Sequence, residues 1–323
     1  MSPRVSVIIP AYNTERYVVR AVESALGQTE RDLEVIVVDD ASTDRTAEMV
    51  RAIRDERVRL LSCRRNLGPG GARNRGLEAA AGEWVALLDS DDWYAPDRLE
   101  RLIQHAEASG ADLVSDDVYL TRSPDSRPWN TLFGIAGERF DAPREISAPE
   151  FVESNLPGQR RARIGLTKPV MRRKFLGRYG IRYDEKVWFG EDFIFYLTCL
   201  ARGARFVVVP EAHYFYLSRP GSLVAGDRLG NLEKLCAANR YALRQELFRR
   251  DPGLVDALEH RQRVIEQRIG YYRVAQPLKR GELAAAAREL RRNPGFVPLL
   301  ARQVPRILRY RFGRLKSGWR SST

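Results

Sequence analysis

Three carboxylates follow directly on an apolar run in the first third of the chain. Residues 84–88 have the length and composition of a buried strand, and Asp89, Asp91 and Asp92 come at its end. Ligands bind outside the carboxyl ends of parallel strands, so these side chains are expected to face a binding site. Carboxylate oxygens are preferred ligands of Mg²⁺ and Mn²⁺. The stretch therefore indicates a divalent-cation site; an acidic loop or a helix N-cap is the simpler alternative.

A second acidic pair, Asp39 and Asp40, follows another apolar run of strand length at residues 33–38. The carboxyl ends of parallel strands meet at one edge of a sheet, so this pair is expected beside Asp89 and Asp91. Two separate groups of acids at one edge favour a shared binding site over two unrelated acidic loops.

Glu191 and Asp192 open an apolar stretch, residues 193–201, that is predicted to be helical. A general base must lie within hydrogen-bond reach of the hydroxyl it deprotonates, and partial burial raises the pKa of a carboxylate towards a useful range. The alternative is that acids in a first helical turn only stabilise the helix dipole. The residues alone leave both interpretations open.

The acids are positioned by strands that alternate with helices. Strand-like apolar runs stand at residues 5–9, 33–38, 58–61, 84–88, 112–115, 206–209 and 213–217. Apolar residues recur at helical spacing in residues 15–28, 47–53, 72–81, 96–108 and 193–201. This alternation predicts βαβ units and an α/β fold with a doubly wound, mostly parallel sheet. Between residues 121 and 156 the periodicity weakens, and a loop with short elements is expected.

The positive charge is concentrated at the C-terminal end. The net charge is +12, and from Lys279 onwards twelve Lys and Arg face two acids, which gives +10. From about Asp227 the sequence also becomes helical and charged. We therefore predict a sheet domain at residues 1–226 and a helical extension at residues 227–323 that ends in a basic tail.

Within the tail, large apolar residues recur at helical spacing, with basic residues mainly on the opposite side. The apolar residues are Leu308, Phe312, Leu315 and Trp319. A helix of this kind suits an anionic membrane surface, and packing on the sheet domain with a solvated basic face is the alternative. The tail shows no nucleic-acid recognition module, so nucleic acid is not an expected partner.

Cysteine usage and hydropathy indicate the cytoplasm. Cys63, Cys199 and Cys236 are widely separated, with neither metal-site nor disulfide spacing, which fits a reducing compartment. No apolar run approaches the roughly 18 residues of a membrane span, and the first apolar run is too short for a signal peptide. A cytoplasmic protein held peripherally on the cytosolic face of a membrane is expected.

Five motifs resemble, in order and spacing, those of family 2 glycosyltransferases with the GT-A fold. They are VIIPAYN at residues 7–13, VVDDASTD at 37–44, ARNRG at 72–76, LDSDD at 88–92 and GED at 190–192. The resemblance covers roughly residues 4–225 and is of the type found in bacterial exopolysaccharide and surface-glycan enzymes. It implies a hexosyltransferase (EC 2.4) that moves a sugar, with inversion, from a nucleotide-diphosphate donor such as a UDP-sugar. The implied acceptor is a growing glycan on a polyprenyl diphosphate at the inner membrane.

The resemblance also assigns roles to individual residues. The implied donor-binding residues are Pro10, Ala11, Tyr12, Asp39, Asp40, Arg73, Arg75 and Asp89. Asp40 matches the carboxylate that hydrogen-bonds the donor's base. Asp91 matches the direct ligand of Mn²⁺ or Mg²⁺, with Asp89 beside it, and such a metal stabilises the charge of the departing diphosphate. Asp192 matches the catalytic base.

Weaker matches concern the acceptor or the diphosphate. They are Glu191, His213, Arg219 and Ser222. Simple packing is the alternative for His213, and a plain polar turn is the alternative for Arg219 and Ser222.

Three rival functions are less well matched. A sugar nucleotidyltransferase needs a basic, glycine-rich signature near the first strand, where residues 10–13 read PAYN instead. A P-loop is also unsupported, because the glycine-rich residues 68–71 lack the following Lys-Ser/Thr. A nucleotide-sugar-binding or scaffolding protein without activity does not need its acids, yet Asp40, Asp91 and Asp192 are all present.

Overall fold

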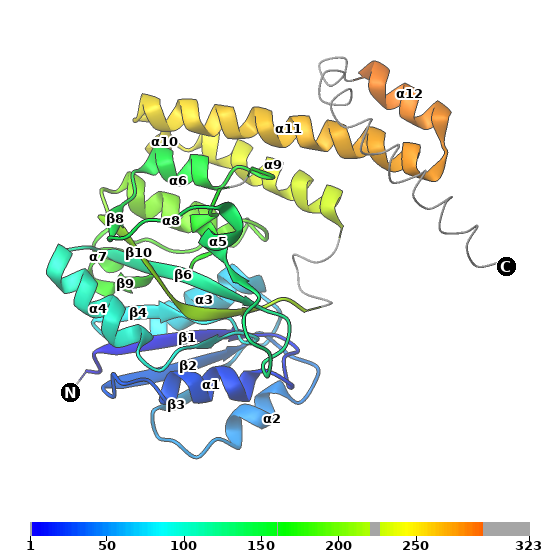
Figure 1. Cartoon of the computed structure of the whole chain (residues 1–323). Helices are drawn as coiled ribbons and strands as arrows, with labels where there is room; N and C mark the ends of the chain where they lie inside the picture. The colour runs from blue at the N-terminus through cyan, green and yellow to red at the C-terminus, as the bar shows by residue number, and fades with distance from the viewer. Residues whose placement is uncertain (1, 160, 220–226, 293–323) are drawn as a thin grey trace.

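The structure is a computed structural model that describes residues 2–159, 161–219 and 227–292. Figure 1 shows a central sheet with helices packed around it and a layer of longer helices above. The strands are β1 (Val5–Ala11), β2 (Leu33–Asp39), β3 (Val58–Ser62), β4 (Trp84–Leu87), β5 (Trp93–Tyr94), β6 (Leu113–Thr121), β7 (Asn130–Thr131), β8 (Arg144–Glu145), β9 (Val170–Arg172) and β10 (Phe206–Leu217). The helices are α1 (Val18–Leu26), α2 (Thr46–Arg51), α3 (Gly68–Ala79), α4 (Arg98–Ser109), α5 (Leu132–Ala136), α6 (Ala148–Ser154), the 3₁₀ turn η1 (Ile164–Leu166), α7 (Arg173–Arg178), α8 (Glu191–Ala201), α9 (Arg228–Arg244), α10 (Glu246–Arg249), α11 (Pro252–Arg280) and α12 (Leu283–Arg292).

One half of the sheet is parallel, as predicted. Its strands run in the order β3-β2-β1-β4, and each neighbouring pair is parallel. β1, β2 and β4 are apolar almost throughout and nearly completely buried, because helices cover both faces of a parallel sheet. The crossover helices α1 and α3 pack back on these strands.

The other half of the sheet is mixed, and here the sequence is less informative. β9, which no sequence pattern predicts, lies antiparallel between β4 and β6. The two strands expected at residues 206–209 and 213–217 are one continuous strand, β10, which pairs in parallel with β6. The register shifts between Val208 and Tyr214, so a bulge interrupts the alternation that a sequence pattern can detect.

Helix α3 starts earlier than the expected residues 72–81, because the glycine-rich residues 68–71 form its first turn. Pro69 stands at the start of the helix, where its fixed φ is favourable. Gly76 sits where the helix meets β1: a Cβ atom there would lie 2.3 Å from Ile8 Cγ2. The helix can therefore approach the sheet closely only with glycine at this position.

The helical part that follows β10 packs onto the sheet part. α11 lies along α6 and α9, above the green elements in Figure 1. Ala242 and Leu258 belong to the same continuous hydrophobic core as the strands. Among the described residues, no helix is long and apolar enough to cross a membrane. The tail from residue 293, with its predicted amphipathic helix, lies outside the described residues.

Candidate functional site

The two acidic pairs meet at one edge of the sheet, as expected. β1 lies between β2 and β4, and all three strands are parallel, so their carboxyl ends face the same way. Asp40 N–H donates to the Ala11 carbonyl at 2.8 Å, and Leu88 N–H donates to the Ile8 carbonyl at 3.0 Å. The first residues of the two acidic turns, 39–44 and 88–92, are therefore still hydrogen-bonded to β1 through their backbone.

Asp40 lies directly after β2, in a turn that faces the residues at the start of α3. Its carboxylate is almost fully buried and accepts a hydrogen bond from Leu67 N–H at 2.7 Å. Burial raises the pKa of this carboxyl, although the backbone amides of Leu67 and Gly68 oppose the shift. Ala41, the next residue, has a φ of 62°, an uncommon conformation for alanine that is typical of functional turns.

The residues predicted to form the wall of a base pocket differ in their exposure. Ala11 is buried and Pro10 is half-buried, whereas Tyr12 is 48% exposed and available to a planar ligand. Asp39 is buried beside them and accepts from Ser42 N–H at 3.2 Å, which holds the turn.

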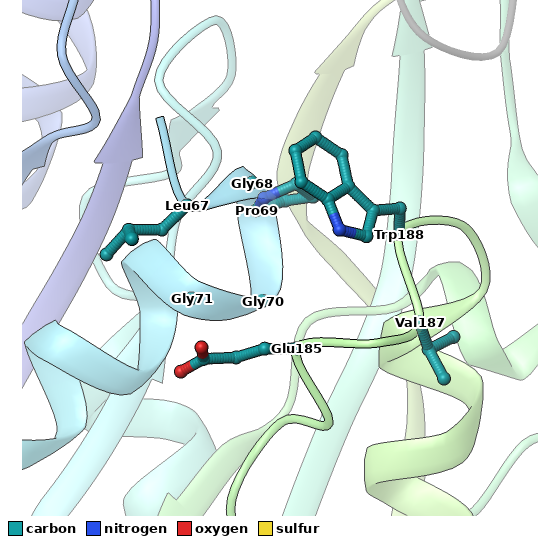
Figure 2. A pocket seen from close by; sticks show the side chains of 8 residues that line it. All are labelled: Leu67, Gly68, Pro69, Gly70, Gly71, Glu185, Val187 and Trp188. Atoms are coloured by element: carbon teal, nitrogen blue, oxygen red, sulfur yellow. The ribbon is translucent and has the colours of Figure 1, made fainter. Parts of the chain in front are cut away.

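A narrow crevice separates the start of α3 from the loop ahead of α8 (Figure 2). Trp188, 59% exposed, covers Gly68, which has a φ of +76°. A Cβ atom on Gly68 would lie 3.3 Å from the indole ring. Glu185 lines the same crevice, which is too narrow for a water molecule. The missing side chain of Gly68 thus lets the Trp188 ring pack directly against the residue that follows Leu67, the backbone donor to Asp40.

Two cations join the acids after β4 to those at the start of α8. Arg73, 4% exposed, donates to Asp89 at 2.9 Å and to Glu191 at 2.8 Å, and its Nη1 lies 3.2 Å from Asp192 Oδ1. Lys168 Nζ lies 2.7 Å from Asp192 and 3.1 Å from Asp89. Three carboxylates thus face two cations, which leaves one negative charge on the group.

The pKa values of two of these acids, Asp89 and Glu191, shift in opposite directions. Burial acts to raise the pKa of Asp89, but Lys168 and Arg73 outweigh it and hold that pKa below its usual range. Burial and the neighbouring Asp192 raise the pKa of Glu191 against the opposing effect of Arg73. Tyr183 adds a neutral donor, with its hydroxyl 3.1 Å from Asp192 Oδ1. Asp192 is therefore held by three side chains from different parts of the fold.

Asp91 is the acid of this edge with the simplest environment. Its Oδ2 accepts from Arg219 Nε at 2.7 Å, and the Arg219 guanidinium lies over the Tyr17 ring, 4.8 Å from its centroid. Burial and the charge of Asp89 raise the pKa of Asp91, and Arg219 opposes this shift. Among the described residues, no three His, Cys, Asp or Glu side chains gather as a metal site. A hard cation fits here only if phosphate oxygens of a ligand complete its coordination.

Asp92 serves the fold. It is buried, and it accepts hydrogen bonds from Tyr214 O–H at 2.7 Å and Leu217 N–H at 2.8 Å. The Tyr214 hydroxyl oxygen in turn accepts from Asp89 N–H at 3.2 Å. These hydrogen bonds connect the acidic turn at residues 88–92 to β10.

Three other predicted residues lie apart from this group of acids or outside the described part of the chain. Arg75 is exposed and pairs with Glu78. His213 N–H donates to Asp116 at 3.1 Å, and its ring is close to the same carboxylate. Ser222 lies outside the described residues.

Lys168 and Tyr183 contact Asp192 but are not predicted from the sequence, and Lys168 is the clearer case. It stands alone between Thr167 and Pro169, ahead of the unexpected strand β9, and no motif marks it. Only the pairing of β9 with β4 brings it to the acids.

Comparisons with known proteins agree with this geometry. The profile of the family described as Glycosyl transferase family 2 matches residues 6–170. The chain is 38% identical, over 95% of its length and 86% of the relative's, to the succinoglycan biosynthesis protein ExoO of Rhizobium meliloti (strain 1021). It is 28% identical, over 68% of its length and 80% of the relative's, to the Escherichia coli UDP-Glc:alpha-D-GlcNAc-diphosphoundecaprenol beta-1,3-glucosyltransferase WfaP.

Solved structures show the fold. Residues 1–349 of S. aureus TarS in complex with UDP-GlcNAc match with a TM-score of 0.58 and 21% identity, over 90% of this chain and 89% of that one. The mannosyltransferase PcManGT of Pyrobaculum calidifontis, in complex with GDP-Man and Mn²⁺, matches with a TM-score of 0.58 and 21% identity, over 95% and 81%. The expected GT-A-like fold is confirmed.

Proposed function

The chain belongs to glycosyl transferase family 2, and on that premise we propose that it transfers a sugar from a nucleotide-diphosphate donor to a hydroxyl of a growing exopolysaccharide. We further propose that transfer inverts the anomeric centre and that the donor is a UDP-sugar. Family membership decides against a sugar nucleotidyltransferase and a scaffolding protein.

One observation carries this proposal: Lys168 and Arg73 join Asp89, at the end of β4, to Asp192, at the start of α8. The turn with Asp40 lies along the same sheet edge. A donor whose base sits at Asp40 and whose diphosphate reaches the acidic turn would present its sugar towards Asp192. The arrangement thus supports a base pocket, a diphosphate region and a proton acceptor in sequence.

Asp192 is the base that we propose. In a single in-line displacement, its carboxylate accepts the proton of the acceptor hydroxyl while that oxygen bonds to the anomeric carbon. The bond from this carbon to the diphosphate oxygen breaks, and the nucleoside diphosphate leaves with the electron pair. Lys168 and Tyr183 fix the carboxylate by hydrogen bonds at 2.7 and 3.1 Å, so that it is oriented before the acceptor arrives.

The proposed cofactor is Mn²⁺ or Mg²⁺, held by Asp91. Both oxygens of Asp89 already face cations, Oδ1 towards Arg73 and Oδ2 towards Lys168, so Asp89 is better suited to order the site than to bind metal directly. When bound, the metal supplies a Lewis acid for the diphosphate. PcManGT, which has a similar fold, was solved in complex with GDP-Man and Mn²⁺, and this supports the choice of metal.

The acceptor and location are inferred from relatives. The name of WfaP specifies a sugar on diphosphoundecaprenol, which supports a lipid-linked acceptor for this chain as well. An acceptor of that kind would be met at the cytosolic face of the inner membrane, where the basic tail is proposed to bind.

The test is a screen of nucleotide sugars by thermal shift with Mn²⁺, followed by transfer assays with and without EDTA. Asp192→Asn is expected to bind the selected donor normally but to transfer about 100- to 10,000-fold more slowly, because general base catalysis contributes that much. Asp97→Asn, on a half-buried acid paired with Arg101 away from the group of Asp89 and Asp192, is the matched control. Full transfer by Asp192→Asn would assign the base to another residue, and full activity in EDTA would remove the metal from the proposal.

A further inference from the structure

Two arginines near the site lack an acidic partner. Arg261, on α11, is 2% exposed, and Arg163, ahead of η1, is partly buried. In the described part of the chain neither forms an ion pair with Asp or Glu, and the stretches outside it contain no Asp or Glu residue. A buried charge without a counterion is costly, so such a pair needs an explanation.

Their contacts are with neutral groups. Arg261 donates to the Asn239 amide oxygen at 2.8 Å, and its guanidinium lies 3.9 Å from the centroid of the Phe193 ring. The Nε atoms of both Arg163 and Arg261 are buried without a hydrogen-bond partner. By contrast Arg98, also fully buried, is neutralised by two hydrogen-bonding nitrogens on Asp116 at 3.0 and 2.7 Å. Arg98 thus has one unpartnered nitrogen, Nη1, as the other two arginines do, but it also has a carboxylate counterion, which Arg163 and Arg261 lack.

The pair lies beside the proposed reaction centre. Phe193, under Arg261, follows directly on Asp192 in α8. Arg163 directly precedes η1, which contacts both α8, the helix that begins with Glu191 and Asp192, and α6, the helix along which α11 lies. Burial lowers the pKa of Arg261 to about 9, and the charge of Arg163 adds to the shift, so the two cations repel each other.

We propose that Arg163 and Arg261 bind an oxyanion of the acceptor next to Asp192. Guanidinium groups bind phosphate and carboxylate oxygens through paired N–H donors, and partial removal from water strengthens such contacts. The anion is either the diphosphate that links a glycan to its lipid or a carboxylate carried by the glycan itself. This inference rests on the proposed function and specifies its acceptor chemistry.

The binding test uses the full chain saturated with UDP, so that the donor site is occupied. Farnesyl diphosphate is expected to raise the melting temperature, farnesol is not, and the rise is expected to be lost in Arg163→Gln and Arg261→Gln. Arg263→Gln, an exposed arginine on the same helix that pairs with Glu259, is the matched control. If Arg261→Gln does not fold, Arg163→Gln and Arg261→Lys carry the test. A response to glucuronate oligosaccharides instead of farnesyl diphosphate would identify the carboxylate source.

The kinetic test uses the selected donor and a diphosphate-linked acceptor. Both glutamine variants are expected to raise the acceptor KM at least 10-fold and to leave the donor KM unchanged. Variants that bind both anions as the wild type does, a wild type that binds neither, or a raised donor KM would each overturn the inference. If anion binding depends on the arginines but no sugar is transferred, the proposed function fails and this site stands; transfer with an unchanged acceptor KM gives the reverse.

Discussion

At the scale of single residues, the site depends on cations that bring acids from different segments together. Asp40, Asp91 and Asp192 could be found from the sequence because they stand in motifs next to strands or a helix. Lys168 could not, because a single lysine acquires its role only through the tertiary contact that places it between Asp89 and Asp192. Its importance is open to a direct test.

Replacing Lys168 by Met keeps the length of the side chain and removes the charge. Hydrogen bonds to charged groups are worth about 1.5–3 kcal/mol, so we expect kcat to fall about 10- to 100-fold with little change in the donor KM. Lys174→Met, on an exposed lysine of α7, is the control. A rise in donor KM without a fall in kcat would show that Lys168 binds the donor instead of positioning Asp192.

Asp92 predicts a pH dependence of stability. Burial, with the charges of Asp91 and Asp89, raises the pKa of this carboxyl well above its usual value. Between its unfolded pKa of about 3.9 and the raised folded value, the folded state holds more protons than the unfolded state, so the contribution of Asp92 to stability falls as pH rises.

The variant Asp92→Asn does not titrate, so its stability relative to the wild type is expected to improve as pH rises from 5 to 8. The slope is at most about 1.4 kcal/mol per pH unit, measured by urea unfolding across that range. The pKa of Asp97 is lowered by its hydrogen bond to Arg101, so Asp97→Asn should show no drift above pH 5. A constant difference for Asp92→Asn would contradict the raised pKa.

At the scale of elements, the parallel half of the sheet was predictable and the mixed half was not. Continuous apolar runs such as β1 and β4 are a strong signal because both of their faces are buried. β9 has only three residues, and β10 carries a bulge that breaks its pattern, so neither offers a clear period. The pattern of the parallel half was enough to predict the fold class, whereas the position of Lys168 depends on the mixed half.

The close approach of α3 to β1 gives a prediction at this scale. Gly76→Ala would place a methyl group 2.3 Å from Ile8 Cγ2, so we expect the free energy of unfolding to fall by about 1–3 kcal/mol. Gly177→Ala, in α7, meets nothing within 4 Å and is expected to stabilise by about 0.5–1 kcal/mol. Urea unfolding of both variants measures the difference, and equal effects would refute the close packing.

At the scale of the whole molecule, the helical part and the basic tail have different consequences. α11 shares the core of the sheet part through residues such as Leu258 and supplies Arg261. The helical part therefore contributes directly to the surroundings of Phe193, the residue that follows Asp192. The sequence predicts helices here but not this role, because α11 has no motif that resembles a site.

The tail is proposed to hold the enzyme on anionic membranes. Deleting residues 300–323 removes seven basic residues and no acid. We expect the truncated chain to lose binding to anionic liposomes in a co-sedimentation assay, while neutral liposomes bind neither form and raised salt releases the full chain. Unchanged binding after truncation would favour the alternative, a tail that packs on the protein.

The ion pairs of Arg73 also bear on how the protein folds. Arg73 and Glu191 are 118 positions apart, and the Asp89 that Arg73 also binds is only 16 away. The parallel half of the sheet can form from local βαβ units, but closing the longer loop requires the chain through α8, and distant contacts of this kind slow folding. A nascent chain that ends before α8 has the residues around Asp40 yet lacks the proposed base. The activity is thus expected to appear late in folding, after the parallel half of the sheet has formed.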